Sequence, residues 1–290
     1  MISSGHVLKL QRAHEHLEWI GAYLKPWIEG NKHSHWLEPD DIPSQIRVMA
    51  RLSEQPAEYP LSVVLGEFLH NMRSALDLLT YELACAYTKP LPDDVAESSE
   101  FPIFGDEDRQ GNGGVGHGLF SKTDRSGSPA RGSGFFKIRG MDPRAQTRIE
   151  GLQPYKRGAD FRRDPLWMLH ELDRINKHRL LHIVAAAGVL QLRVDPGHDQ
   201  TLFPFVGTIQ SFSGMNLGKK PAKVGILSVR PDFREDQVKV HPEAAVYVLV
   251  DNVPTLADEL SFNGPPALDS LASIYNHVVS VVLPNLTPYF

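Results

Sequence analysis

The sequence predicts an α+β protein with a helical bundle core of about four main helices, an antiparallel β-sheet of about four to five strands and a long Gly-rich loop. Apolar residues recur at three- and four-residue steps in four segments, which is the spacing of helices that bury one face. A later stretch has short runs rich in Val, Ile and Phe, which are typical of strands. With 290 residues, of which 41% are hydrophobic, the chain is expected to form a single domain over 1–290.

Composition disfavours several classes of protein. The net charge is −5, which argues against nucleic-acid binding over the whole surface but allows a local basic patch. Cys85 is the only cysteine, so no disulfide can form within the chain and a cytoplasmic location is expected. No apolar run approaches the roughly 20 residues that cross a bilayer, and no membrane partner is expected. The P-loop, HExxH and CxxC motifs are absent, and we expect no cofactor.

The four main helices are predicted from their apolar stripes and from the residues at their ends. Their expected ranges are 7–25, 61–87, 164–181 and 266–283. Pro26 is expected to end the first helix, because proline lacks a backbone donor. Asp164 followed by Pro165 is a typical helix start, with an N-cap side chain and proline in the first turn. The same signal predicts a shorter helix from Asp142 to about Gly151.

Strands are predicted mainly within the β-rich part 183–252, where four runs alternate or are short and apolar. Ser44–Leu52 alternates in the same way and is a possible fifth strand. The region 105–134 is rich in Gly and Ser and has few apolar residues, so it is predicted to be a long loop. The apolar segments Glu100–Phe104 and Phe135–Gly140 are expected to tie its ends to the body.

The segment 164–182 carries the densest group of ionisable side chains. If it is helical throughout, one strip of its surface holds Trp167, Glu171, Arg174, His178 and His182. Asn176 falls within the apolar arc instead, so it is expected to be buried and hydrogen-bonded. This helix is expected to pack against the helix at 61–87 and to share a polar site with it.

The first functional hypothesis is metal-independent cleavage of RNA, with RNA as the partner. Attack of a 2′-hydroxyl on the neighbouring phosphate needs a group that titrates near neutral pH and a cation that holds the phosphate. Arg174 and His178 are one helical turn apart and supply both, and His70 and Arg73 are expected to contribute from the helix at 61–87. The residues expected to support these four are Asn71, Asp77, Glu171, Asp173, Asn176, Lys177, Arg179 and His182.

Two stretches also carry a resemblance. They read HN-x-RSALDLL, from His70 to Leu79, and PLW-x-LHELD-x-x-NKHRLLH, from Pro165 to His182. They resemble a family of uncharacterised bacterial proteins that share nearly the same two motifs. More remotely, a polar motif late in a helical bundle is similar to HEPN-superfamily domains, many of which are ribonucleases that act as toxins or phage-defence effectors. That likeness implies an Arg and a nearby His as site residues, although Arg174 and His178 are closer together than is usual in that superfamily.

Two alternatives stay open. One is a metal site in the helical bundle, for which Glu67 and His70 give half of a Glu-x-x-His ligand pattern and Glu171 and His178 complete the set. The other is a non-catalytic interaction module, which could form a homodimer through its helices and in which a buried polar network fixes the register of the helices. The members of that network are Arg73, Asp77, Asp173, Asn176, Lys177 and Arg179.

Overall fold

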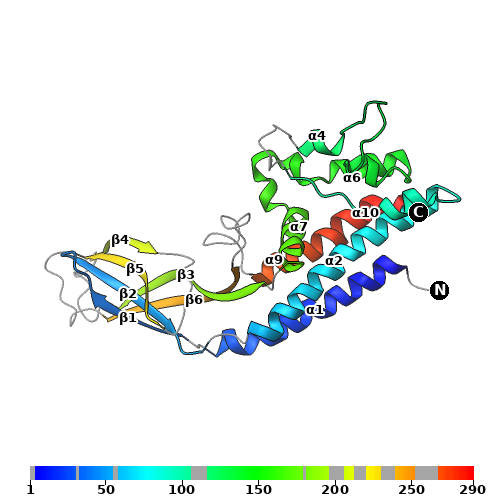
Figure 1. The fold of residues 1–290 in the computed structure, drawn as a ribbon. Coiled ribbons are helices and arrows are strands. Elements are labelled where there is room, and N and C mark those ends of the chain that lie inside the picture. The colour runs from blue at the N-terminus through cyan, green and yellow to red at the C-terminus, as the bar shows by residue number, and fades with distance from the viewer. Residues whose placement is uncertain are drawn as a thin grey trace.

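The computed structural model describes residues 4–30, 33–54, 58–105, 116–178, 181–195, 206–211, 220–229, 239–251 and 267–290. The predicted α+β class is confirmed. Figure 1 shows the helices gathered in one part of the molecule and the strands extending from one end of it. In the described ranges, no helix is long and apolar enough to cross a membrane.

Four helices form the core of the helical part, as predicted. They are α1 (Gly5–Glu29), α2 (Glu58–Tyr87), α7 (Pro165–Asn176) and α9 (Ala267–His277). The helices α1 and α2 run antiparallel along each other, and α7 and α9 pack against them (Figure 1). One face of α2 is completely buried at its centre, where Phe68, Leu69 and Met72 are inaccessible to solvent. The apolar stripe read from the sequence therefore faces the core.

The first helix differs from its prediction at the C-terminal end. It continues through Pro26 to Glu29, and Pro26 accepts the backbone hydrogen bond of Gly30 at 3.0 Å. Tertiary contacts hold this last turn in place: Leu24 is buried, and the Trp27 indole donates to the carbonyl of Glu54 at 3.2 Å. Proline weakens a helix locally, but packing of the same face outweighs that effect here.

The helix predicted at 164–181 is shorter than expected. Asp164 caps it as predicted and accepts from the backbone N–H of Leu166 at 2.9 Å, but α7 ends at Asn176. His178 lies in the turn that follows, and His182 begins a strand, β3 (His182–Asp195). The expected strip that joined Glu171 to His178 and His182 on one helical face is therefore wrong, because the chain pairs with a distant strand instead of continuing the helix.

The strands form two sheets among the described residues. The first has the order β1-β2-β5-β4, and the second is the pair β3-β6; all pairings are antiparallel. The bounds of the strands not yet given are β1 (His33–Pro39), β2 (Gln45–Leu52), β4 (Val206–Ser211), β5 (Ala222–Val229) and β6 (Lys239–Asp251). In β2 the side chains of Ile46, Val48, Ala50 and Leu52 are buried, which confirms the predicted alternation. The sequence prediction missed β1, which pairs with β2 in the connection between α1 and α2.

The Gly-rich region is only partly a loop. Residues 106–115 lie outside the described part of the chain. Beyond them come α4 (Gly116–Phe120) and then a turn closed by a bridge between Thr123 and Pro129. Phe120 is completely buried and anchors this region to the core. A Cβ on Gly134 would lie 2.3 Å from the Phe120 ring, so the absence of a side chain there lets the ring pack.

The remaining helices are short. The predicted helix after Asp142 is confirmed as α6. The closing helix contains a π-helical turn within its predicted range and continues one turn beyond it, to Leu286. The short helices α3, α4, α5 and η1 were not predicted. The bounds are α3 (Asp93–Ser98), α5 (Gly134–Lys137), α6 (Pro143–Gly151), η1 (Pro154–Arg163), η4 (Val278–Val282), α10 (Leu283–Leu286) and η5 (Thr287–Tyr289).

Candidate functional site

A polar pocket of about 560 Å³ opens where α1, α2 and α7 meet. Six of the residues predicted for the site line it: Glu67, His70, Asn71, Asp173, Asn176 and Lys177. The helices α2 and α7 therefore share a polar site, as the sequence analysis predicted. The structure adds a third wall, because α1 contributes Lys9, Arg12 and His16.

His16 lines the pocket, and the sequence analysis did not predict it as a site residue. It lies three residues after Ala13 and four before Ile20, both of which are buried, so the helical spacing places it on the apolar side of α1. Its neighbour His14 is half-exposed, pairs with Glu18 at 3.4 Å and stacks on the ring of Tyr275 in α9, and it does not line the pocket. The helical spacing of His16 from Ala13 and Ile20 was therefore the signal that could have placed it on the buried side. The charged residues around it made the segment look like an exposed surface.

The environment of His16 keeps its imidazole neutral at neutral pH. The side chain is only 8% exposed, and Nδ1 lies 3.6 Å from Oε2 of Glu67. Burial lowers the pKa of His16 below 6.5, the nearby Arg12 guanidinium lowers it further, and the Glu67 carboxylate opposes them in part. The nearby carboxylate favours the neutral tautomer with its proton on Nδ1, and in that tautomer Nε2 is the nitrogen that can accept a proton.

Lys9 and Asn71 connect the two long helices beside this pair. Lys9 donates to Oδ1 of Asn71 at 3.3 Å, and the Asn71 amide donates to the carbonyl of Glu67 at 2.8 Å. The second bond fixes the orientation of the Asn71 amide, so its oxygen is left to face the lysine. A cation is thereby held at the pocket near the His16–Glu67 pair.

Asn176 lies directly over α2, although it is half-buried and not fully buried as expected. A Cβ added to Gly66 would be 2.6 Å from Oδ1 of Asn176, so the pocket is shaped by the lack of a side chain at Gly66. One turn earlier, Asp173 is buried, and its Oδ2 accepts from Lys177 at 2.7 Å. The close approach of Asn176 to Gly66 brings the end of α7 against α2, whereas the Asp173–Lys177 pair lies within the α7 segment itself.

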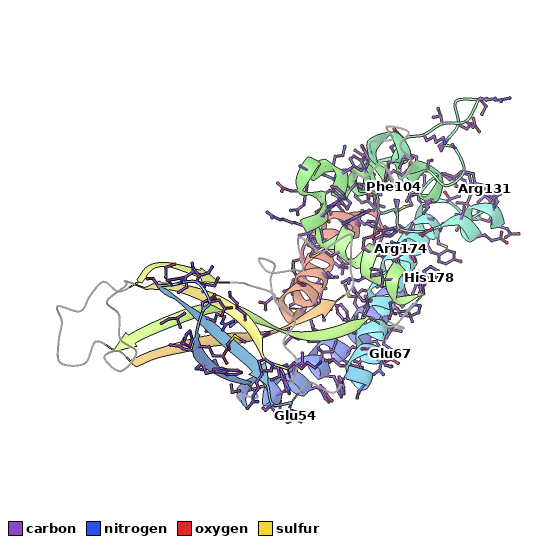
Figure 2. All side chains as sticks on the ribbon, turned by 60° about the vertical axis from the view of Figure 1, so that its left-hand side comes forward. Glu54, Glu67, Phe104, Arg131, Arg174 and His178 are labelled. Atoms are coloured by element: carbon purple, nitrogen blue, oxygen red, sulfur yellow. The ribbon has the colours of Figure 1, made fainter. Side chains whose placement is uncertain are left out.

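Arg174 and His178, the pair predicted to carry catalysis, do not line the pocket. The Arg174 guanidinium lies 2.9 Å from Oε2 of Glu171, whose side chain is completely buried. His178 is exposed in the turn after α7. Figure 2 shows Arg174 and His178 on α7 and its following turn, and Glu67 on the neighbouring α2. Arg179 lies outside the described residues, as does the side chain of His182.

Arg73 and Asp77 do not line the pocket; they lie on another side of α2, where they contact the segment at Glu100 and Phe101. The Arg73 guanidinium donates to Oε1 of Glu100 at 2.8 Å and to the carbonyl of Phe101 at 2.6 Å, and it lies 3.0 Å from Asp77. Asp77 in turn accepts from the backbone N–H of Phe101 at 3.0 Å. Burial raises the pKa of Asp77, and Arg73 counteracts this. The two residues therefore clamp the extended chain before the Gly-rich region onto α2, as expected for Glu100–Phe104.

The proposed set of metal ligands is not brought together. Across the described ranges, no group of three or more His, Cys, Asp and Glu side chains is arranged to hold a metal ion. Glu67 and His70 line the pocket, whereas Glu171 is enclosed in the core with Arg174 and His178 is exposed beyond the helix end. The Glu67, His70, Glu171 and His178 site is therefore wrong, because α7 ends before it can present the last of these ligands.

Comparisons with family models, with curated proteins and with solved structures find no match for this chain. The resemblance to HEPN-superfamily domains stays a prediction.

Proposed function

We propose that this protein binds RNA at the pocket between α1, α2 and α7 and cleaves it without a metal ion. The observation that supports this most is a neutral, buried imidazole, His16, beside a carboxylate in a pocket that also holds Lys9 and Arg12. These are a proton acceptor and two cations, of which Lys9 donates to Asn71 and Arg12 pairs with Glu15 at 2.7 Å. Attack of a 2′-hydroxyl on a phosphodiester requires both kinds of group. The proposal keeps the predicted reaction but places it on other residues than Arg174 and His178.

Each residue of the pocket has a separate role in the proposed reaction. His16 removes the proton of the 2′-hydroxyl, and the new bond from O2′ to phosphorus forms as the bond to O5′ breaks. The products are a 2′,3′-cyclic phosphate and a free 5′-hydroxyl. His70, which lies one helical turn from Glu67 at the same pocket, gives a proton to the departing 5′-oxygen. Lys9 and Arg12 stabilise the extra negative charge on the phosphate in the transition state.

The test is cleavage of end-labelled RNA by the purified protein, with and without EDTA. We expect cleavage in both conditions and a product that ends in a cyclic phosphate. Cleavage that EDTA abolishes would contradict the proposed mechanism, and so would intact RNA at every protein concentration. Labelled DNA of the same sequence is the control substrate, because it lacks the 2′-hydroxyl and is expected to remain intact.

The rate of cleavage is expected to depend on pH through His16. A general base must be unprotonated to act. Because the pKa of His16 is lowered from 6.5, its imidazole loses its proton at a pH below that value. The acid limb of the rate profile should therefore lie below pH 6.5. Arg12→Gln removes a cation that lowers this pKa, so the limb should move to higher pH. Glu67→Gln removes a carboxylate that raises it, so the limb should move to lower pH. Limbs that coincide in all three proteins would contradict the role of His16.

A non-catalytic interaction module is the second candidate function, and the clamp of Arg73 and Asp77 on Phe101 favours it. That clamp supports a structural role for part of the predicted polar network. The network is not continuous, however, since Asp173 and Lys177 pair with each other at the pocket, on another face of the helices. Under this alternative the pocket would bind RNA or a protein partner, including a second copy of the chain, without cutting.

A further inference from the structure

An exposed aromatic pair lies on α1, about one helical turn beyond His16. The rings of Trp19 and Tyr23 are stacked, with their centroids 4.9 Å apart and their planes 15° from parallel. The Trp19 side chain is 39% exposed, whereas tryptophan is mostly buried in folded proteins. Tryptophan and tyrosine are enriched at surfaces that bind partners, because their rings offer a large flat apolar area. The pair is therefore a candidate surface for a flat group.

The helical period places this pair on the same side of α1 as the pocket residues. At 100° per residue, Trp19 is rotated by about 60° from His16 and by about 20° from Arg12, both of which line the pocket. His16 faces Glu67 at 3.6 Å across the two antiparallel helices (Figure 1). Three residues further along α1, this register brings Trp19 to about the level of Val63 in α2. Val63 lines the pocket and is 38% exposed, so the aromatic pair extends the pocket along α1.

The indole of Trp19 is directed toward the cations of the pocket. Side chains of a helix lean toward its N-terminus, so Tyr23 packs behind Trp19 and the other face of the indole is turned toward Arg12 and His16. Glu15 lies on this side too, but it pairs with Arg12 at 2.7 Å, which compensates its charge. At 1.5 Å per residue, Trp19 is about 10 Å along α1 from Arg12. A base on the indole would therefore have its backbone phosphate near these cations.

We propose that Trp19 and Tyr23 form a stacking platform for an unpaired base of single-stranded RNA, beside the phosphate that is cleaved; this inference rests on the proposed function. Proteins that bind single strands combine aromatic rings, on which the bases stack, with cations that follow the phosphates. Bases inside a duplex are already stacked on one another and cannot lie on the indole. Because every base has a flat face, the platform selects single strands rather than a particular base.

Binding of fluorescein-labelled oligonucleotides tests the platform without any cleavage. The probes are a single-stranded deoxyribonucleotide and the duplex of the same sequence, neither of which has the 2′-hydroxyl that the reaction needs. They are compared at an ionic strength of about 0.15 M, at which exposed charges are partly screened. The single strand is expected to bind about tenfold more tightly than the duplex and to quench tryptophan fluorescence. Equal affinities, or no binding of the single strand, would overturn the inference.

Three variants locate the platform. Trp19→Leu is expected to weaken binding of the single strand about tenfold, because leucine has no flat π-face, whereas Trp19→Tyr keeps a ring and should keep most of the affinity. Tyr81→Leu is the matched control, since Tyr81 is 42% exposed on α2 but does not line the pocket, and its affinity should equal that of the parent. All three substitutions are at exposed positions outside the core, so the melting temperatures should stay near the parental value. An unchanged affinity in Trp19→Leu would overturn the assignment.

A second copy of the chain would cover the same surface if two α1 helices packed on each other. In that case Trp19→Leu would lower the molecular mass measured by light scattering and would leave the affinity for the single strand unchanged. That result would overturn the platform. A mass that is the same in the parent and in Trp19→Leu, together with the expected loss of affinity, would support it.

The two proposals can fail separately. Binding of the single strand through Trp19 by a protein that leaves labelled RNA intact would refute the ribonuclease but support the platform. Cleavage of single-stranded RNA with the same kcat/KM in Trp19→Leu as in the parent would support the ribonuclease and refute the platform.

Discussion

His16→Asn is expected to lower the rate of RNA cleavage by about 10²- to 10⁴-fold, the usual contribution of a general base. The substitution keeps an amide nitrogen near the place of Nδ1, which faces Glu67 at 3.6 Å, but removes the group that accepts the proton. The measurement is the initial rate of cleavage of labelled RNA, together with the melting temperature of the variant. A loss of rate in a protein that melts like the parent assigns the effect to chemistry rather than to folding.

Two other histidines provide matched controls for this experiment. His14→Ala changes a half-exposed residue of the same helix that stacks on Tyr275 of α9, and His178→Ala changes an exposed residue after α7. Both are expected to cleave RNA at nearly the parental rate, because neither residue lines the pocket. If His178→Ala abolished cleavage while His16→Asn did not, the reaction would belong to the Arg174–His178 pair and not to the pocket.

Arg73→Met is expected to have the largest effect on stability, a loss of about 2–4 kcal/mol in the free energy of unfolding. The methionine fills much of the same volume but leaves the carbonyl of Phe101 and the carboxylates of Asp77 and Glu100 without their common donor. The loss stays below that of a fully enclosed ion pair because Asp77 and Glu100 are partly exposed to water. Equilibrium urea unfolding measures it.

Arg144→Met is the control for this variant. Arg144 also pairs with an aspartate, Asp142 at 2.9 Å, but its side chain is 78% exposed, and exposed pairs contribute at most about 1 kcal/mol. A change below that value is expected. If both variants unfolded at the same urea concentration as the parent, Arg73 would not clamp the chain. Arg73→Met would then be a variant to assay for RNA cleavage, as the sequence analysis originally suggested for Arg73.

The candidate site was predictable in part. The motifs around His70 and Asp173 correctly placed α2 and α7 at a shared polar pocket, because their ionisable residues recur at helical spacing beside apolar stripes. The contribution of α1 was not predicted. His16, Lys9 and Arg12 look like an ordinary charged surface in the sequence, and only the packing of α1 along α2 brings them to Glu67 and Asn71.

The sequence by itself determined the α+β class, the existence of the main helices and most strands, since these depend on periodicity and on local end signals such as Asp164 before Pro165. The tertiary structure decided where α7 ends, because His182 pairs with Asp251 of β6, a partner that local spacing cannot reveal. It also decided that Arg73 faces Phe101 while His70 faces the pocket. Residues three apart on a helix differ in direction by about 60° at 100° per residue, so the neighbouring elements determine which of them meets the core and which meets the site.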